Sequence, residues 1–256
     1  MGALYTVGSS MFWGGFRALG LDVRPIDHHN IPSSGPAVIA SNHIGYLDFA
    51  LVVLAPPKPR REVRFLARAE FFDKPVVGGL MHKLGQIPVD VHGDPMQAAE
   101  VARKELERGE LIGMHPEGTI SPSFVPRRAK SGAVRLADSA GAPIVPVAVW
   151  GSQRILTKGG SFNATRGAVI TVTFGPPVPY EPDEDPAEVS DRLMTAIGEL
   201  VDEAQRTYPQ APAGPDDEWW LPAHLGGSAP TPEEAERRAR EEAARRRERF
   251  ERGSGQ

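Results

Sequence analysis

The sequence contains no cysteine among its 256 residues, carries little net charge and has no long apolar run. The absence of cysteine excludes disulfide bonds and thiolate catalysis, and it removes a frequent zinc ligand. No stretch approaches roughly eighteen consecutive apolar residues, so the sequence predicts no membrane-spanning helix. A formal net charge of -4 gives no basic excess, and nucleic acid is therefore not an expected partner.

The length and the order of the apolar stretches predict one substantial α/β domain with an appendage. Strand-like and helix-like segments alternate along the chain and are separated by Gly, Pro and Ser. The predicted strands cover residues 37–40, 63–67, 86–91, 111–114, 142–151 and 168–174. The predicted helices cover residues 74–84, 95–108, 133–137 and 186–207, and residues 49–54 can open another buried helix.

The two ends of the chain differ in composition from the domain predicted at residues 25–208. Residues 1–24 form an amphipathic segment that either lies in a lipid interface or packs on the domain as a first helix. Residues 209–256 begin with an extended Pro- and Gly-rich linker and end in a charged, solvent-exposed helix. In the linker, Trp219 and Trp220 dock either on the domain or on lipid, and the sequence does not decide between them.

Polar residues follow the first predicted strand, where the chain changes direction: Asn42, His43 and Asp48. If Ser41 or Asn42 caps a helix, Asp48 lies a little over one turn beyond His43, and its carboxylate reaches the imidazole. Such a contact fixes the tautomer, and the other ring nitrogen can then take a proton from an alcohol. The alternative is structural: a helix cap, a buried histidine and a first-turn charge.

A second polar loop, HPEGT at residues 115–119, follows the strand predicted at 111–114. It places a carboxylate, a flexible backbone and a hydroxyl at the end of a strand, where open α/β sheets bind ligands. A tight turn with a surface glutamate is the alternative interpretation. The basic cluster Arg127, Arg128 and Lys130 comes shortly afterwards.

Taken together, these motifs resemble the glycerolipid acyltransferase family, which includes the lysophosphatidic acid acyltransferases. Four blocks occur in the family's order across roughly residues 30–180. They are Asn42, His43 and Asp48, matching NH-x4-D; GQIPVD at 85–90, similar to the family's glycine, apolar and aspartate block; HPEGTIS at 115–121, similar to FPEGTRS; and PIVPVAV at 143–149, similar to an apolar block around proline. The run KSGAVRLAD at 130–138 also resembles the family's Lys-x-Gly-Ala segment.

The resemblance implies a single α/β domain with a mixed, largely parallel sheet flanked by helices, and transfer of a fatty acyl group from a thioester to an alcohol. His43, held by Asp48, would be the base for the acceptor hydroxyl. Backbone amides near Gly118 or just after Asn42 would bind the oxyanion. The thioester already carries a good leaving group, so no nucleophilic side chain is needed, and the sequence has no Gly-x-Ser-x-Gly elbow.

The implied co-substrates are acyl-CoA or acyl carrier protein as donor and a lysolipid as acceptor, most simply 1-acylglycerol 3-phosphate. No cofactor and no metal is implied. The catalytic residues would be His43 and Asp48. The residues expected to bind substrate are Asn42, Arg68, Asp90, Glu117, Gly118, Thr119, Arg128 and Lys130. Those expected to bind the acyl chain are Val145, Pro146 and Val147.

Four positions depart from the family pattern. Val91 and Ile120 stand where the family carries arginines that are assigned to the acceptor's phosphate. His115 replaces the usual phenylalanine, and Gly45 replaces the usual serine. The acceptor is therefore either a lysophosphatidate bound by other cations or a different lipid alcohol, and a lipid-binding relative without turnover is a third interpretation. The cations that can replace the arginines are Arg68, His92, Arg127, Arg128 and Lys130.

The resemblance and the N-terminal segment together predict a peripheral protein at the cytoplasmic face of the cell membrane. Residues 1–24 are expected to provide the apolar contact with lipid. Arg60, Arg61 and Arg64 are expected to contact anionic headgroups.

Overall fold

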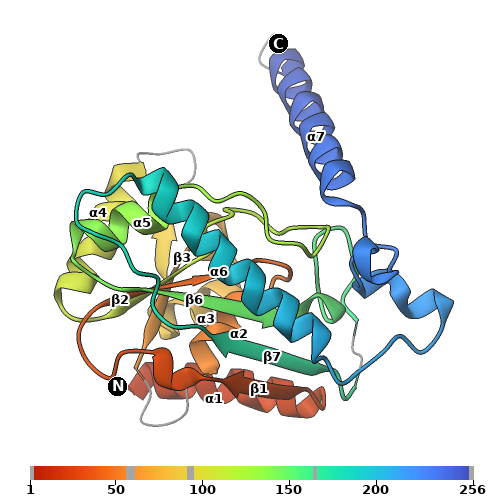
Figure 1. Ribbon diagram of the computed structural model, residues 1–256, viewed down its shortest axis with the longest axis horizontal. Helices are drawn as coiled ribbons and strands as arrows, with labels where there is room; N and C mark the ends of the chain where they lie inside the picture. The colour runs from red at the N-terminus through yellow and green to blue at the C-terminus, as the bar shows by residue number, and fades with distance from the viewer. Residues whose placement is uncertain (1–2, 56–60, 91–94, 164–165, 254–256) are drawn as a thin grey trace.

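The computed structural model describes residues 3–55, 61–90, 95–163 and 166–253. Within these residues, seven strands form one sheet in the order β1-β7-β6-β2-β5-β3-β4 (Figure 1). The strands are β1 (Asp22–Ile26), β2 (Ala37–Ser41), β3 (Val63–Arg68), β4 (Ile87–Val89), β5 (Leu111–Met114), β6 (Ile144–Trp150) and β7 (Val169–Phe174).

The sheet is mixed and largely parallel, which confirms the predicted fold class. Strands β6, β2, β5, β3 and β4 run in the same direction, whereas β7 is antiparallel to β6 and β1 is parallel to β7. All seven residues of β6 are buried, with Val145 and Val147 facing one core and Ile144 and Ala148 facing the other. A strand that is covered on both faces needs apolar residues throughout, which explains its continuous apolar sequence.

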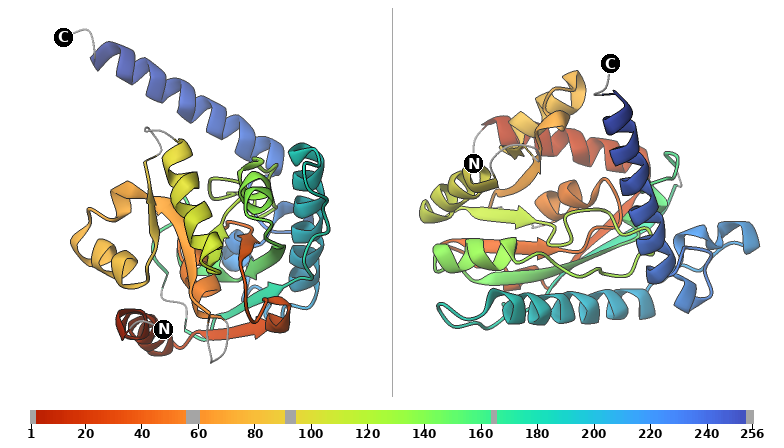
Figure 2. Two further views of the ribbon diagram at one scale, coloured as in Figure 1. Left: turned by 90° about the vertical axis from the view of Figure 1, so that its left-hand side faces the viewer. Right: turned by 90° about the horizontal axis from the view of Figure 1, so that it is seen from above.

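Helices cover both faces of the sheet (Figure 2). Helices α1 (Ala3–Ala18), α2 (Asp48–Leu54) and α3 (Pro75–Lys83) lie on one face, and α4 (Pro95–Glu107), α5 (Gly132–Ser139) and α6 (Pro186–Arg206) lie on the other. Helix α6 shows why the sequence predicts these elements well. The carboxylate of Asp185 caps its first turn by accepting from the amide of Ala187, and its buried residues recur at helical spacing. The short 3₁₀ helices are His28–Asn30, Ala69–Phe71, Ser152–Arg154, Pro215–Trp220 and Ala223–Leu225.

The N-terminal segment belongs in part to the domain. Strand β1 pairs with β7 and crosses the boundary predicted at residue 24, so that boundary lies inside the sheet. Helix α1 packs against α2 and α3, and its Phe16 enters the main core with 4% of its surface exposed. Met11 on the same helix is 57% exposed, so α1 also presents apolar surface to the outside.

The arginines predicted to contact lipid headgroups are engaged within the fold. The guanidinium of Arg61 donates to the carbonyl groups of Pro32 and Gly109, and Arg64 forms an ion pair with Glu105 at 2.8 Å. Arg60 lies outside the described residues. The side chains of Arg61 and Arg64 thus both have partners within the protein, and their contact with headgroups stays a prediction.

The folded domain extends beyond Tyr208, and the prediction of an extended linker from residue 209 is wrong. Trp220 is fully buried in a small core with Ile44 and Trp150, and it also contacts the ring of Tyr208. A large aromatic side chain gains too much from burial to stay in solvent, which explains why this segment folds back. Helix α7 (Pro232–Gly253) then extends away from the domain, as its charged sequence predicts (Figure 1).

Candidate active site

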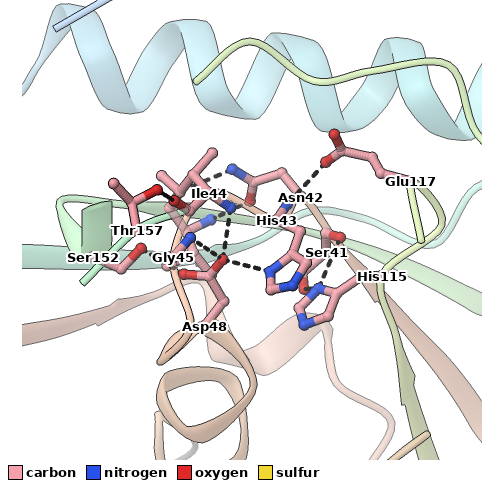
Figure 3. A network of polar contacts seen from close by, with 11 residues as sticks. Ser41, Asn42, His43, Ile44, Gly45, Asp48, His115, Glu117, Ser152 and Thr157 are labelled. Atoms are coloured by element: carbon pink, nitrogen blue, oxygen red, sulfur yellow. Dashed lines mark hydrogen bonds and ion pairs between the residues drawn. The ribbon is translucent and has the colours of Figure 1, made fainter. Parts of the chain in front are cut away.

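The candidate site lies where the parallel strands end. Asn42 and His43 directly follow β2, and His115 directly follows the neighbouring strand β5. Ser152 comes just after β6, on the other side of β2. Because these three strands run in the same direction, their carboxyl ends bring the two predicted polar loops together at one edge of the sheet (Figure 3).

His43 and Asp48 form the predicted pair. The Nδ1 atom of His43 lies 2.9 Å from Oδ2 of Asp48, and 19% of the histidine side chain is exposed while the carboxylate is fully buried. The local backbone structure that makes this contact differs from the prediction. Neither Ser41 nor Asn42 caps a helix, since residues 42–47 form a loop and α2 begins at Asp48 itself.

The Asp48 carboxylate is held by four donors. Besides His43 Nδ1, its Oδ2 atom accepts from the amides of Ile44 at 2.7 Å and Gly45 at 2.8 Å, and its Oδ1 accepts from the Ser152 hydroxyl at 2.5 Å (Figure 3). Because Oδ2 of Asp48 is the acceptor in the contact with the imidazole, Nδ1 of His43 carries the proton and Nε2 is left as the acceptor.

Asn42 ties the loop after β2 to the neighbouring strand β6. Its side chain is fully buried, and its amide donates to the carbonyl of Val149 at 3.0 Å while its oxygen accepts from the Val149 amide at 2.7 Å. Both polar atoms are therefore used in tying the loop to β6. The expectation that Asn42 binds substrate is corrected to a positioning role.

Glu117, in the second loop, also holds backbone segments together, as Asn42 does in the first. Its carboxylate accepts from the backbone amide of His43 at 2.8 Å and from that of Arg127 at 3.0 Å. Only 6% of the residue is exposed, and this burial raises the pKa of Glu117 to about 8. The side chain thus connects three loop segments in the interior, and the expectation that it contacts substrate is corrected.

His115 is a site residue that the sequence marked only as a departure from the family pattern. Its ring stacks on His43 with 4.0 Å between centroids and 3° between planes, and its Nδ1 lies 3.0 Å from the Ser41 hydroxyl. Burial, followed by the neighbouring His43, lowers the pKa of His115 to about 3. It is therefore neutral at physiological pH and supports one face of the His43 imidazole.

The turn of HPEGT presents a basic surface beside the site. Gly118 is exposed in a left-handed conformation with φ of 68°, and Lys130 places its ammonium 3.8 Å from the point that a Cβ on Gly118 would occupy. Arg128 is exposed, and Thr119 is half-buried. Ile120 is 5% exposed, so its apolar side chain lies in the interior and supplies no cation at this surface.

The remaining predicted substrate residues lie further out. Arg68 ends β3 and Asp90 follows β4, and both are exposed at the same edge as His43, one and two strands beyond β5. Val91 and His92 lie outside the described residues. The predicted contact of Arg68 and Asp90 with substrate stays a prediction.

The predicted acyl-binding residues are part of the core. Val145, Pro146 and Val147 lie within β6 and are buried, and both valines belong to the apolar core between the sheet and the first three helices. A substrate chain cannot reach side chains that already pack against the protein. The apolar pattern of this block therefore reflects a central strand, and the acyl-binding prediction is wrong for these three residues.

The amides predicted to bind the oxyanion are also occupied. The amide of His43 donates to Glu117, and those of Ile44 and Gly45 donate to Asp48. The amide of Gly118 donates to the carbonyl of His115 at 2.9 Å. These four groups stabilise the loops, so they are not available to a tetrahedral intermediate in this conformation.

The described residues form neither a metal-binding cluster nor a membrane-spanning helix. Among them, no three His, Asp or Glu side chains gather in an arrangement that could bind a metal ion. None of the described helices is long and apolar enough to span a bilayer.

Both polar loops lie within the part of the chain that is similar to known proteins. A model of the family described as Acyltransferase matches residues 22–150, which include both polar loops. The chain is 30% identical over 129 residues to a 1-acyl-sn-glycerol-3-phosphate acyltransferase of Bacillus subtilis, covering 50% of this chain and 63% of that protein. It is 28% identical over 155 residues to the corresponding enzyme of Borreliella burgdorferi, covering 60% of this chain and 61% of that protein. The chain thus spans less than two thirds of the length of both relatives.

The fold is also that of a solved structure. The crystal structure of the 1-acyl-sn-glycerophosphate acyltransferase PlsC from Thermotoga maritima is similar, with a TM-score of 0.67. The match covers 80% of this chain and 81% of that one at 20% sequence identity. At this identity the similarity supports the architecture of the domain.

Proposed function

The chain belongs to the acyltransferase family, and from this premise we propose that it transfers a fatty acyl group from acyl-CoA or acyl carrier protein to the hydroxyl of a lysophospholipid. The proposed acceptor is 1-acylglycerol 3-phosphate, and the proposed role is phospholipid synthesis. The observation that carries the proposal is the His43–Asp48 pair at the carboxyl edge of the sheet, with Nε2 of His43 as acceptor.

The pair suits acyl transfer to an alcohol. Nε2 of His43 removes the proton of the acceptor hydroxyl as its oxygen attacks the thioester carbonyl. The tetrahedral intermediate then collapses, the C–S bond breaks, and the leaving sulfur takes the proton from the imidazolium. Asp48 keeps Nδ1 protonated and stabilises the imidazolium throughout, while His115 holds the ring plane.

The test of the activity is a direct assay. We expect the protein to transfer a labelled acyl group from acyl-CoA to 1-acylglycerol 3-phosphate, and His43→Ala to lower the rate by about 10²–10⁴-fold because the base is lost. His82→Ala is the matched control, since this exposed histidine lies on α3, outside the candidate site. Comparable rates for His43→Ala and the wild-type protein would refute the base assignment.

The acceptor's phosphate is proposed to bind the exposed cations next to HPEGT. Lys130 lies beside Gly118, and Arg128 is exposed two residues before it. Each charge-assisted contact with phosphate contributes roughly 1.5–3 kcal/mol. Lys130→Ala should therefore raise the KM for 1-acylglycerol 3-phosphate about tenfold or more and change the KM for an uncharged lipid alcohol much less.

A second candidate acceptor is a lipid alcohol without a terminal phosphate. The buried side chain of Ile120 favours it, because the cation that the family carries at this position is missing. A panel of lysolipids and neutral lipid alcohols decides between the two. Acylation of a neutral alcohol together with no turnover of any phosphate-bearing lysolipid would support the second candidate and contradict the first.

A peripheral position at the cytoplasmic face of the cell membrane is part of the same proposal. It is supported by apolar side chains on two helices that pack together: Met11 of α1, 57% exposed, and Val76 of α3, 82% exposed. The double variant Met11→Asp with Val76→Asp should sediment less with anionic vesicles. The matched control is Val101→Asp, which adds a charge at an exposed valine of α4 on the opposite face of the sheet. Equal sedimentation of both variants and the wild-type protein would contradict the proposed contact.

A further inference from the structure

Ser152 reaches the catalytic carboxylate because the chain turns sharply at the end of β6. Gly151 has a φ of 96°, and a Cβ there would come within 2.2 Å of the carbonyl oxygen of Val169, so only glycine fits. The turn buries Ser152 completely and directs its hydroxyl to Oδ1 of Asp48 at 2.5 Å. The sequence does not indicate this contact, because residue 152 lies 104 positions from Asp48.

Residue 45 faces the same space from the other side. A Cβ added to Gly45 would lie 3.0 Å from the Ser152 hydroxyl and 3.1 Å from the carbonyl oxygen of Leu156. A serine side chain at position 45 would therefore enter the volume that the Ser152 hydroxyl fills. Gly45 is also the position at which the chain departs from the usual serine of its first motif.

We propose that Ser152 is a positioning residue that delivers, from the end of β6, a hydroxyl to Asp48 in place of a side chain at residue 45. The proposal rests on the proposed acyltransferase function. Gly45 leaves the space, Ser152 fills it, and the two positions form an exchangeable pair.

The hydroxyl acts on the base through the carboxylate. Three N–H groups bind Oδ2 of Asp48, and the Ser152 hydroxyl is the donor to Oδ1. With both oxygens bound, the carboxylate stays in the orientation that points Oδ2 at Nδ1 of His43. Without the hydroxyl, Oδ1 would be buried without this donor, and the carboxylate could rotate away from the imidazole.

The same segment offers a control that is structural only. The hydroxyl of Thr157 donates to the carbonyl of Ile44 at 2.6 Å, and the carbonyl of Leu156 accepts from the amide of Tyr46 at 3.0 Å. These bonds hold the catalytic loop but do not touch the carboxylate. Thr157→Val removes a buried hydroxyl at nearly constant volume. Like Ser152→Ala it deletes one buried hydrogen bond, but not one to the carboxylate.

The experiment is a reciprocal exchange followed by steady-state kinetics. Ser152→Ala should lower kcat by about ten- to a hundredfold, the effect of losing one hydrogen bond to a charged group, with KM changed less than about twofold. Adding Gly45→Ser to Ser152→Ala should restore most of the lost kcat after a shift of a few tenths of an ångström around Leu156 and the backbone of residue 152. Gly45→Ser alone should lower kcat, because two side chains then compete for one space. Any loss in Thr157→Val should not be restored by Gly45→Ser.

The outcomes separate this inference from the proposed function. The proton NMR signal of His43 Nδ1–H reports the contact with Asp48 without turnover, and it should move in Ser152→Ala and return in the exchanged variant. A wild-type protein that is inactive but shows this response would refute the acyltransferase proposal and support the role of Ser152. If the exchanged variant does not fold, Ser152→Ala alone decides: a kcat and an Nδ1 signal like those of the wild-type protein overturn the inference.

Discussion

Glu117 offers a prediction about stability that follows from its position alone. Its carboxylate is 6% exposed, and although two backbone amides bind it, burial raises its pKa to about 8. In the unfolded chain a glutamate titrates near 4.3. The folded protein therefore binds this proton more tightly than the unfolded chain does.

The sign and the size of the effect follow from this difference in pKa. Stability contributed by the protonated form of Glu117 is complete below about pH 4 and is lost as the pH rises through about 8. A difference of about 3.7 pH units corresponds to roughly 5 kcal/mol at most. The free energy of unfolding should thus fall by up to about 1.4 kcal/mol for each pH unit between 5 and 8 from this group.

Chemical denaturation at a series of pH values tests the prediction. The wild-type protein and Glu117→Gln are compared, because every other titrating group contributes equally to both, and the difference isolates residue 117. Glutamine cannot ionise, so the difference in unfolding free energy between the two proteins should shift steadily in favour of Glu117→Gln from pH 5 to 8. A constant difference across that range would refute the reasoning and would mean that the two amide donors outweigh the cost of burial.

Three further predictions concern individual side chains. Asp48→Asn should lower kcat to within about tenfold of His43→Ala, because an amide cannot hold the correct tautomer of the imidazole, and steady-state kinetics measure it. His115→Ala should lower kcat by about two- to tenfold through loss of the stacked ring, whereas His115→Phe should retain most of it; equal rates for both would contradict a stacking role. Trp220→Ala should reduce the free energy of unfolding by about 3–5 kcal/mol in a denaturant titration, since the side chain is fully buried.

Most of the fold could be predicted because its elements obey local rules. Strands β2, β5, β6 and β7 are continuous or alternating apolar runs, and α6 repeats its buried residues at helical spacing from a capped start. Strand β1 was not predicted, because its sequence, DVRPI, is largely exposed at the edge of the sheet and contains proline. The folding of the segment after Tyr208 was not predicted, because its composition is typical of a linker. The burial of one tryptophan nevertheless holds it on the domain.

The His43–Asp48 pair of the candidate site could be predicted from the sequence. The residues that hold this pair in place could not. His43 and Asp48 are close in sequence, so their contact is visible in the motif. The bond from Ser152 to Asp48 and those between Asn42 and Val149 join residues more than a hundred positions apart, and only the folded sheet brings them together. For the apolar block around Pro146, the sequence pattern indicated a binding role that burial contradicts. A buried central strand and an acyl-binding surface have the same sequence pattern, and burial alone separates them.

The burial of Ile120 makes this position unsuitable for testing which headgroup the acceptor carries. An arginine introduced at this position would have to place its charge in the interior, where a charge without a partner is costly, or disturb the loop whose Ser121 amide donates to the carbonyl of His43 at 2.7 Å. Loss of activity in Ile120→Arg would therefore say little about the acceptor. The exposed ammonium of Lys130 can be removed without such damage, because it lies at the surface beside Gly118. The dependence of KM on residue 130, compared between a phosphate-bearing lysolipid and a neutral lipid alcohol, is consequently the measurement that identifies the acceptor's headgroup.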